Sequence, residues 1–413
     1  MSANEESPLS MGERPAATEV ERLTFINCSM EAFENPWLSH QQLMSRLARR
    51  HTVMYVTRES SLDEARAALA SGQRLRSQLR LLAPNIHELR PTAMLPRFYF
   101  SKLLDKVSSS LRARTIRLAA ASVGGPRRSV LYFWNPHFID LVGRARESLS
   151  VFHMHDYHPG FAKAGTLAHA RVLENFKRSI LESDLVIACS EALLHEAFAH
   201  GRKDAKLVEN GVDFETVSGG AAMPEPVEFA KMKRPIIGHI GRINRKLEME
   251  AIGRIARARP DWSVVLMGPR TGWPDKYADR FSELLSLPNV HYLPGRGWDQ
   301  LPAYFNALDV GLMAYRTAGT WMAYGFPLKM WEYFSLGKTV VGSDVMSLRK
   351  FSKLLQLVPA DGDWVAAVQT AMDADSPSLR QERKALARQY DWNARAELIE
   401  SLILEALAAK QTR

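Results

Sequence analysis

Cysteine is nearly absent from this chain of 413 residues: Cys28 and Cys189 are the only two. Two cysteines so far apart in a chain of this size do not make the disulfide framework of a small secreted domain. Each follows an apolar run, where cysteine usually serves as a small buried hydrophobe. No group of Cys and His has the spacing of a structural zinc site, so a zinc-stabilised module is also excluded.

Long hydrophobic runs are missing as well. No uninterrupted apolar stretch approaches the roughly 18–20 residues that span a bilayer. Residues 1–21 are polar and acidic and lack the apolar core of a secretory signal, so we expect them to form a disordered leader. These absences predict a cytoplasmic protein, with peripheral contact to the inner face of the plasma membrane as the one membrane role left open.

The composition, with 46% hydrophobic and 24% charged residues, is typical of a soluble globular protein, and the length suits two domains. The net charge of +9 is spread unevenly along the chain. Residues 66–128 hold 13 Lys and Arg but only two acidic residues, Glu88 and Asp105. A local basic patch of this kind favours an anionic surface as a partner.

Short β-rich segments alternate with helical patterns, and the alternation occurs twice. Apolar strands separated by helices are typical of a parallel sheet covered on both faces. Between the two series, residues 218–233 contain GGAAMPEP and show little periodicity, so we expect a linker there. The predicted strands are 23–29, 52–57, 130–134, 150–156 and 185–190, then 235–240, 262–268, 289–295, 309–315 and 339–344.

The predicted fold class is therefore α/β, with two Rossmann-like, doubly wound parallel-sheet domains that face each other across a cleft. We expect the domains at 22–217 and 234–390, and a separate C-terminal helix at 391–413. Ligands of open α/β sheets bind beyond the carboxyl ends of the strands, so the best site would lie in the cleft.

The strongest local signal is PIIGHIGRINRK at residues 235–246. A strand runs into Gly238 and Gly241, and the basic residues Arg242, Arg245 and Lys246 follow before the next helix. Glycines let a ligand approach the backbone, a helix start offers free N–H groups, and cations neutralise phosphate, so the pattern suits a diphosphate. Neither GxxxxGK[ST] nor GxGxxG is present. An ordinary tight turn with solvated basic side chains fits the same residues.

A second signal is PLKMWEYFSLGKTVVGSD at residues 327–344. Lys329 and Glu332 are three residues apart on a predicted helix and therefore share one face. A carboxylate near a helix start can accept two ribose hydroxyls, and a lysine beside it can reach a phosphate. A solvated surface ion pair is the alternative.

Taken in order, the motifs resemble those of the GT-B-fold glycosyltransferases, and most of all the large retaining group called group one or family four. The resemblance implies that the C-terminal domain binds a UDP-sugar or GDP-sugar donor without a metal. It also implies that the N-terminal domain binds the acceptor and that the last helix packs back on this domain. The motifs that carry it are NGVD (210–213), GHIGR (238–242), LPNVHYLPG (287–295), LPAYFNALDVGLMAY (301–315) and PLKMWEYFSLGKTVV (327–341).

The resemblance implies roles for single residues. The donor diphosphate would lie at the glycine loop that includes Gly241. There it would be bound by Arg242 and by one of Arg245 or Lys246. The loop at 294–296, with Gly295 at its centre, would hold the nucleotide base through backbone atoms.

Further along, Glu332 would bind the ribose hydroxyls, and Lys329 would contact a phosphate or the donor sugar. One position departs from the family pattern: Tyr324 stands where a glutamate usually holds hydroxyls of the donor sugar. The identity of the sugar and the retaining outcome therefore stay open.

The segment VFHMHDYHPG at 151–160 ends a predicted strand at the cleft edge. The resemblance suggests that His155 or Asp156 faces the donor sugar, and we take both as the catalytic candidates. An imidazole can donate to a sugar hydroxyl or a leaving oxygen, and a carboxylate could deprotonate an acceptor hydroxyl. A histidine bound to backbone is the alternative.

His153 and His155 share a strand face, but no third ligand has a suitable spacing, so no metal is expected.

The first loop, MEAFENPWLSH at 30–40, lies at another expected cleft edge. Its residues Glu31, Glu34, Asn35 and His40 either touch the acceptor or are simply solvated.

Residues 96–122, PRFYFSKLLDKVSSSLRARTIRLAAAS, interleave Lys and Arg with large apolar side chains. A basic amphipathic helix of this kind suits an anionic membrane surface, because apolar side chains enter the interface and cations face the headgroups. A core-packed helix with a solvated basic face is the alternative. No nucleic-acid partner is expected, since no recognised DNA- or RNA-binding motif accompanies the charge.

The sequence thus predicts a hexosyl-type glycosyltransferase that moves a sugar from a nucleoside diphosphate to a hydroxyl, with retention. The acceptor would be lipid-linked or a polysaccharide. Two alternatives remain: a nucleotide-sugar epimerase of the same fold, and a non-catalytic peripheral membrane or assembly protein with a degenerate site.

Overall fold

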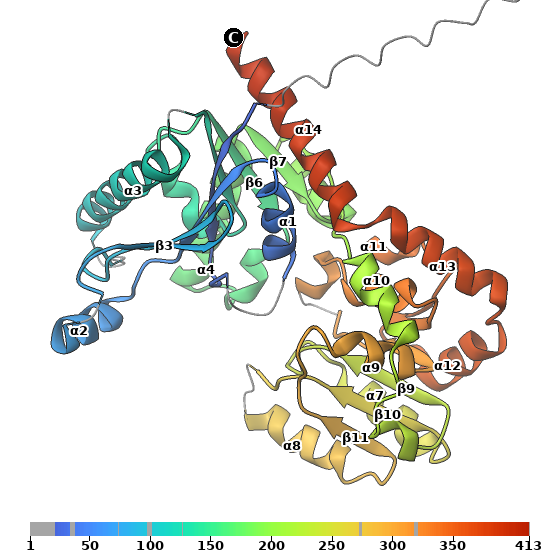
Figure 1. Ribbon diagram of the computed structural model, residues 1–413. Coiled ribbons are helices and arrows are strands. Elements are labelled where there is room, and N and C mark those ends of the chain that lie inside the picture. Colours follow the sequence, from blue (N-terminus) through green and yellow to red (C-terminus); the bar gives the residue numbers. More distant parts are fainter. Residues whose placement is uncertain are drawn as a thin grey trace, which may run out of the picture.

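The computed structural model describes residues 21–33, 38–72, 74–96, 101–125, 127–271, 275–317 and 321–412. Two sheets, each flanked by helices, form two lobes joined side by side (Figure 1). The predicted α/β fold with two Rossmann-like parallel-sheet domains is confirmed. The predicted leader, residues 1–21, lies outside the described residues apart from Glu21.

The N-terminal domain is built on a sheet of strand order β3-β4-β2-β1-β5-β6-β7-β8 among the described residues. All neighbouring strands run parallel except the edge strand β3, which pairs antiparallel with β4. Helices α1 to α5 surround this sheet. The strands are β1 (Thr24–Ser29), β2 (Thr52–Thr57), β3 (Gln78–Ala83), β4 (Ile86–Arg90), β5 (Ser129–Phe133), β6 (Leu149–Met154), β7 (Leu185–Ala188) and β8 (Lys206–Leu207). The helices are α1 (Ser39–Leu47), α2 (Leu62–Ser71), α3 (Lys102–Gly124), α4 (Leu167–Glu182) and α5 (Glu191–Ala199), with 3-10 turns η1 (Pro136–Leu141) and η2 (His158–Phe161).

The C-terminal domain has an all-parallel sheet of order β11-β10-β9-β12-β13-β14. Its strands are β9 (Ile236–Ile240), β10 (Ser263–Met267), β11 (Val290–Leu293), β12 (Val310–Met313), β13 (Thr339–Ser343) and β14 (Gln356–Val358). Its helices and turns are α6 (Phe214–Ser218), η3 (Gly219–Ala222), η4 (Phe229–Lys231), α7 (Met249–Ala258), α8 (Asp275–Leu285), α9 (Leu301–Ala307), η5 (Trp321–Tyr324), α10 (Lys329–Ser335), α11 (Met346–Arg349), α12 (Trp364–Asp373) and α13 (Pro377–Gln389).

Most strands are buried along their whole length because helices cover both faces of each sheet. Strands β1, β6, β9 and β10 have no exposed residue, which explains their continuous apolar sequences. Strands β3 and β4 escaped prediction because they are polar and partly exposed. Arg80 and Arg90 each bind the buried carboxylate of Glu88, at 2.8 and 2.7 Å. Charged side chains at this sheet edge hide the strand pattern.

The segment 218–233, which lacks periodicity in sequence, contains the short turns η3 and η4 rather than extended chain. The buried Phe229 lies edge-on against Tyr304 of α9, with ring centroids 5.6 Å apart. This segment therefore packs on the C-terminal domain.

The last helix, α14 (Trp392–Gln411), crosses from the C-terminal domain onto the N-terminal domain (Figure 1). Its buried residues Ile399 and Ile403 share a core cluster with Leu43 of α1. Glu400 accepts from the buried His51 and from Arg50, each at 2.9 Å. The helix thus ties the two domains together at their back.

Candidate active site

A cleft with a volume of about 500 Å³ lies between the two domains. The carboxyl ends of strands from both sheets border it, as the fold predicts. From the C-terminal domain it is lined by Gly241, Arg242, Lys246 and Lys329, and from the N-terminal domain by His155 and Asp156, among others. Six of the predicted site residues therefore meet in one hollow.

The glycine loop after β9 brings the cationic side chains together. A Cβ on Gly241 would lie only 2.8 Å from Cε of Lys329, so a side chain there would push the lysine out of place. Arg242 follows directly and is exposed to the cleft. Burial and the charge of Lys329 lower the pKa of the neighbouring His239 to about 4, so its imidazole is neutral. The loop therefore presents cations without competing side chains.

Lys329 and Glu332 form the predicted pair on one face of α10. Nζ of Lys329 lies 2.7 Å from Oε2 of Glu332, and both side chains are largely buried. Lys329 lines the cleft, and Glu332 lies beside it without being a lining residue itself. The phenol pKa of the half-buried Tyr315 is raised by burial and then by the charge of Glu332. The pair places a carboxylate and an ammonium group together at the start of a helix.

Three features that the sequence predicted to bind the donor do not line the cleft. Arg245 does not line the cleft; its guanidinium carbon lies 4.6 Å from the ring centre of Trp321. Gly295 follows β11, outside the cleft lining, and a Cβ there would lie 3.2 Å from Pro269. The N-terminus of the next helix was also predicted to offer free N–H groups to the diphosphate. However, α7 begins only at Met249, and none of its residues lines the cleft.

The opposite wall is rich in histidine. His155 and Asp156 follow β6, with Nε2 of His155 3.6 Å from Oδ2 of Asp156. His158 lies edge-on to His155, at 5.1 Å between ring centres. Burial, then the charges of His155 and Arg242, lower the pKa of His40 to about 3. His40 and Arg242 line the same cleft, so the two walls face each other.

His153 is separate from this group. It is buried, its Nδ1 lies 2.7 Å from the hydroxyl of Tyr132, and its ring stacks on Trp134 at 4.2 Å. Burial lowers the pKa of His153 to about 3. This histidine therefore has a core role and does not line the cleft.

Tyr324 does not line the cleft and instead contacts the N-terminal domain. Its ring stacks on Tyr157 with 4.2 Å between centres and 15° between planes, and its carbonyl accepts from Ser190 at 2.5 Å. Trp321 lies 4.9 Å from Phe161 in the same contact. Tyr324 stands where the family that the sequence resembles has a sugar-binding glutamate, and here it helps to join the two domains.

Sequence reasoning gave no site role to several lining residues. His158, Trp134 and Asn210 come from three different loops of the N-terminal domain. His158 stands in the same HDYHPG segment as His155, so its place beside a strand end was a usable signal. Of the first loop, Glu31 and His40 line the cleft, whereas Glu34 and Asn35 lie outside the described residues.

Among the described residues, no group of three or more His, Cys, Asp and Glu side chains is arranged to hold a metal ion. Every helix in this part of the chain is too short or too polar to span a bilayer. Both cysteines are buried and free.

The chain is similar in sequence and in fold to known glycosyltransferases. The family described as glycosyl transferases group 1 matches residues 234–373. TuaH of Bacillus subtilis (strain 168), a proposed teichuronic acid biosynthesis glycosyltransferase, is 28% identical over 314 residues, or 74% of this chain and 76% of TuaH. Among solved structures, a sucrose-phosphate synthase from Thermosynechococcus elongatus has a TM-score of 0.69 at 17% identity, covering 94% of this chain and all of its own. Anabaena HepE in complex with UDP-glucose has a TM-score of 0.64 at 15% identity, covering 93% of this chain and 99% of its own.

The fold and these similarities together define a glycosyltransferase of the GT-B fold. Within that class, residues 234–373 match the group 1 family, which the sequence motifs also resemble.

Proposed function

We propose that this enzyme transfers a sugar from a nucleoside diphosphate to a hydroxyl group in the cleft. The observation that carries the proposal is the meeting of Arg242, Lys246 and Lys329 on one wall with His155 and Asp156 on the other. Three fixed cations suit a diphosphate, and the imidazole and carboxylate suit a sugar and its acceptor.

The donor is proposed to be a UDP-sugar or GDP-sugar. Its diphosphate would lie against Arg242 and Lys246, its ribose against Glu332, and its base near the 294–296 loop. The fold relative HepE was solved in complex with UDP-glucose, which supports a nucleotide sugar as donor class. Because Arg245 contacts Trp321, Lys246 is the better second phosphate ligand.

The proposed chemistry is transfer with retention at the front face of the sugar. As the glycosidic bond breaks, negative charge develops on the diphosphate, and preorganised cations stabilise that charge most when it is largest. Arg242, Lys246 and Lys329 supply this stabilisation from the protein itself, so we propose that no metal is needed. His155 would donate a hydrogen bond at the sugar or leaving oxygen.

The acceptor is proposed to be a lipid-linked sugar or a growing polysaccharide, entering from the N-terminal domain. The sequence relative TuaH is named for the biosynthesis of a polysaccharide, which supports this class. Glu31 and His40, which line the N-terminal side of the cleft, would meet the acceptor first.

Donor binding should stabilise the fold and should depend on Glu332. A ligand at 100 times its Kd stabilises a protein by about 2.7 kcal/mol. We therefore expect UDP or GDP, and the matching nucleotide sugar, to raise Tm clearly in a thermal-shift panel. In Glu332→Gln and Glu332→Ala the ligand-induced shift should fall by more than half, because the ribose hydroxyls lose a charged two-oxygen acceptor in the first variant and any acceptor in the second.

The exposed carboxylate Glu250 on α7 provides the matched control: Glu250→Ala should keep the full shift. An equal shift in the Glu332 variants would contradict the ribose assignment. No shift with any nucleoside diphosphate would favour the degenerate-site alternative. A new nucleotide sugar formed without acceptor would favour the epimerase.

We also propose that α3 contacts an anionic membrane, because its outer face is apolar and basic. Leu104, Val107, Leu111 and Leu118 are spaced three, four and seven residues apart, so they form one stripe, and their exposed fractions lie between 44 and 57%. Lys106, Arg114 and Arg117 lie on the same helix, and none takes part in an ion pair among the described residues. Phe98, Tyr99 and Phe100 of the predicted segment lie outside the described residues.

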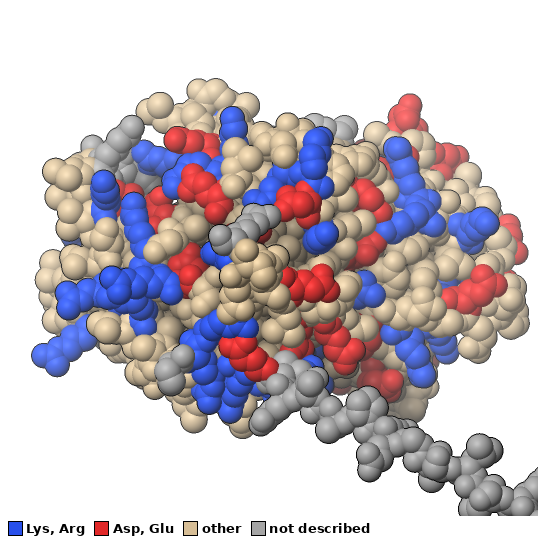
Figure 2. All heavy atoms as spheres, turned by 90° about the horizontal axis from the view of Figure 1, so that it is seen from above, with Lys and Arg blue, Asp and Glu red and all other residues tan. Residues whose placement is uncertain are grey.

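Strand β3 extends this surface. Leu79 pairs with Leu89, and Leu81 with His87. Leu89 belongs to the core under α3, with Ile116, so Leu79 and Leu81 lie on the same sheet face as α3. They are 41 and 66% exposed. Figure 2 shows Lys and Arg side chains projecting from this end of the molecule, at the left, with uncharged residues between them.

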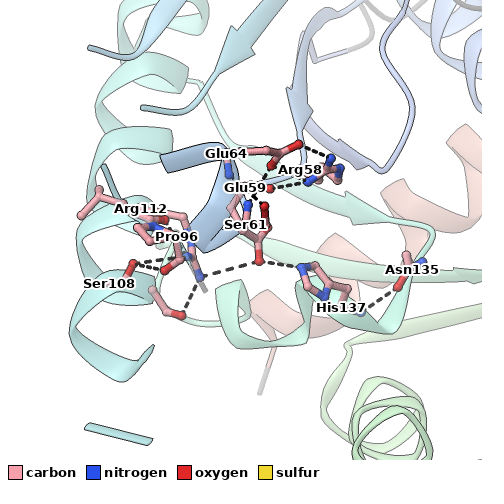
Figure 3. Close-up of polar contacts among 11 residues, drawn as sticks. Arg58, Glu59, Ser61, Glu64, Pro96, Ser108, Arg112, Asn135 and His137 are labelled. Atoms are coloured by element: carbon pink, nitrogen blue, oxygen red, sulfur yellow. Dashed lines mark hydrogen bonds and ion pairs between the residues drawn. The ribbon is translucent and has the colours of Figure 1, made fainter. Parts of the chain in front are cut away.

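The inner face of α3 is already fixed, so the outer stripe is not needed for packing. The buried Arg112 donates to the carbonyl of Leu95 at 3.0 Å and to Oγ of Ser109 at 2.7 Å, and it lies 4.0 Å from Glu59 (Figure 3). Glu59 in turn lies 2.5 Å from Nε2 of His137. This buried network holds α3 against its own domain, with the apolar stripe facing outward.

Vesicle flotation tests the membrane contact. The protein should float with vesicles that contain phosphatidylglycerol, remain behind with pure phosphatidylcholine, and be released by salt. Each basic residue contributes about 1 kcal/mol at an anionic surface, so Lys106→Glu/Arg114→Glu should weaken binding by at least about 30-fold. Val107→Ser/Leu118→Ser should also weaken it, whereas Leu167→Ser, at a 91% exposed site on α4, should not. Unchanged binding in both double variants, or a dimer that buries the stripe, would overturn the proposal.

A further inference from the structure

The two walls of the cleft carry opposite charge. Among the described lining residues, every Lys and Arg belongs to the C-terminal domain: Arg242, Lys246 and Lys329. The lining residues of the N-terminal domain, from Ser29 to Asn210, are called the N-terminal wall here. This wall contains the carboxylates Glu31 and Asp156 and no Lys or Arg. A ligand that spans the cleft therefore meets cations on one side only.

The cleft-lining cations of the C-terminal domain are balanced by Glu332 and the diphosphate together. Lys329 is already paired with Glu332 at 2.7 Å, so the three cations and this carboxylate leave two positive charges. A diphosphate in a nucleotide sugar carries two negative charges. Once it is bound, this wall has no further cation to offer a second anionic group, and a buried charge without a partner is costly.

The histidines of the N-terminal wall do not supply the missing cation. Burial lowers the pKa of His40 to about 3 and also lowers the pKa of His158, so both imidazoles are neutral near pH 7. His155 already faces an anionic neighbour, because its Nε2 lies 3.6 Å from Oδ2 of Asp156. Each of these three rings has a nitrogen without a hydrogen-bond partner among the described residues. Such nitrogens suit hydroxyl and amide groups of an uncharged sugar.

We infer that the sugar transferred by this enzyme is uncharged, a hexose or N-acetylhexosamine rather than a uronic acid. The inference rests on the proposed function, since it requires that the donor sugar lies against the N-terminal wall. A uronate in that position would place its carboxylate near Glu31 and Asp156 with no cation in reach. Charge repulsion, rather than shape, is then the basis of the selection.

The test compares donors that differ only in charge at C6. Competition against labelled UDP and GDP would measure the Kd of UDP-glucose against UDP-glucuronate and of GDP-mannose against GDP-mannuronate. For the base that binds, we expect the neutral sugar to bind at least 30-fold more tightly. Equal or tighter binding of the uronate would overturn the inference, while binding of the bare nucleoside diphosphate would keep the proposed function. If no nucleoside diphosphate binds, the proposed function fails, and the inference fails with it.

A charge introduced on the N-terminal wall should reverse the preference. Met30 lines the cleft, is 41% exposed, and has an unbranched side chain that arginine can replace. In Met30→Arg the ratio of uronate to neutral affinity should rise at least tenfold, and Met30→Gln, of similar length without charge, should leave the ratio unchanged. The bare nucleoside diphosphate should bind both variants as it binds the parent, which separates a change in selectivity from a loss of folding. An unaltered ratio in Met30→Arg would count against selection by charge.

Discussion

Replacement of Arg242 by alanine is expected to lower kcat/KM for the nucleotide sugar by about 100- to 1000-fold, the cost of removing one preorganised charge-stabilising group from an active site. Arg242 lies in the cleft and is exposed, so its loss should leave Tm nearly unchanged. Steady-state kinetics with the donor identified by thermal shift would measure the effect. Arg242→Lys should recover only part of the activity, because an ammonium group cannot reproduce the two-pronged contact of a guanidinium.

Arg254 gives the matched control for this experiment. It lies in the same domain, on α7, and is exposed away from the cleft. Arg254→Ala removes the same charge from the domain and should change kcat/KM by less than about twofold, since distant surface charges are screened. A similar loss in both variants would mean that general charge, rather than a phosphate contact, explains the effect.

Replacement of His155 by alanine is expected to lower kcat by about 100-fold with little change in KM. The reason is that its hydrogen bond should strengthen only as charge develops on the sugar and leaving oxygen. Asp156→Asn should have a smaller effect, and the double variant should cost less than the two single changes together. Coupling of this kind is expected for side chains only 3.6 Å apart.

The stereochemistry of the product checks the same pair. If transfer is retaining, NMR of the product should show the anomeric configuration of the donor in the wild-type enzyme and in both variants. An inverted product from the wild-type enzyme, together with complete loss of activity in Asp156→Asn, would instead identify Asp156 as a general base. That result would remove the front-face mechanism while leaving the donor site in place.

The cationic side of the cleft, which we propose binds the donor, was the most predictable part of the site. Gly241, Arg242, Lys246, Lys329 and Glu332 lie in two short stretches, each on a strand-loop-helix unit whose local geometry follows from sequence. Strand β9 ends at Ile240, directly before Gly241, and a helical spacing of three puts Lys329 beside Glu332. Local rules of this kind do not depend on the rest of the molecule.

The other wall could not be predicted as a unit. His40, Trp134, His158 and Asn210 come from segments more than 20 residues apart, and nothing in the local pattern relates one segment to another. The same limit applies to Tyr324, whose stacking on Tyr157 joins residues 167 positions apart. Such contacts depend on how one sheet is placed against the other.

By itself, the sequence determined the class of fold, the two series of strands, the resemblance to a family, and the position of the cationic glycine loop, because each depends on local patterns of apolar and charged residues. Only the tertiary structure decided that Lys246 rather than Arg245 reaches the cleft, that Tyr324 joins the domains, and that one wall holds all the cations. These features depend on how segments far apart in the sequence pack against one another. That packing is set by burial and long-range contacts, which exist only in the folded chain.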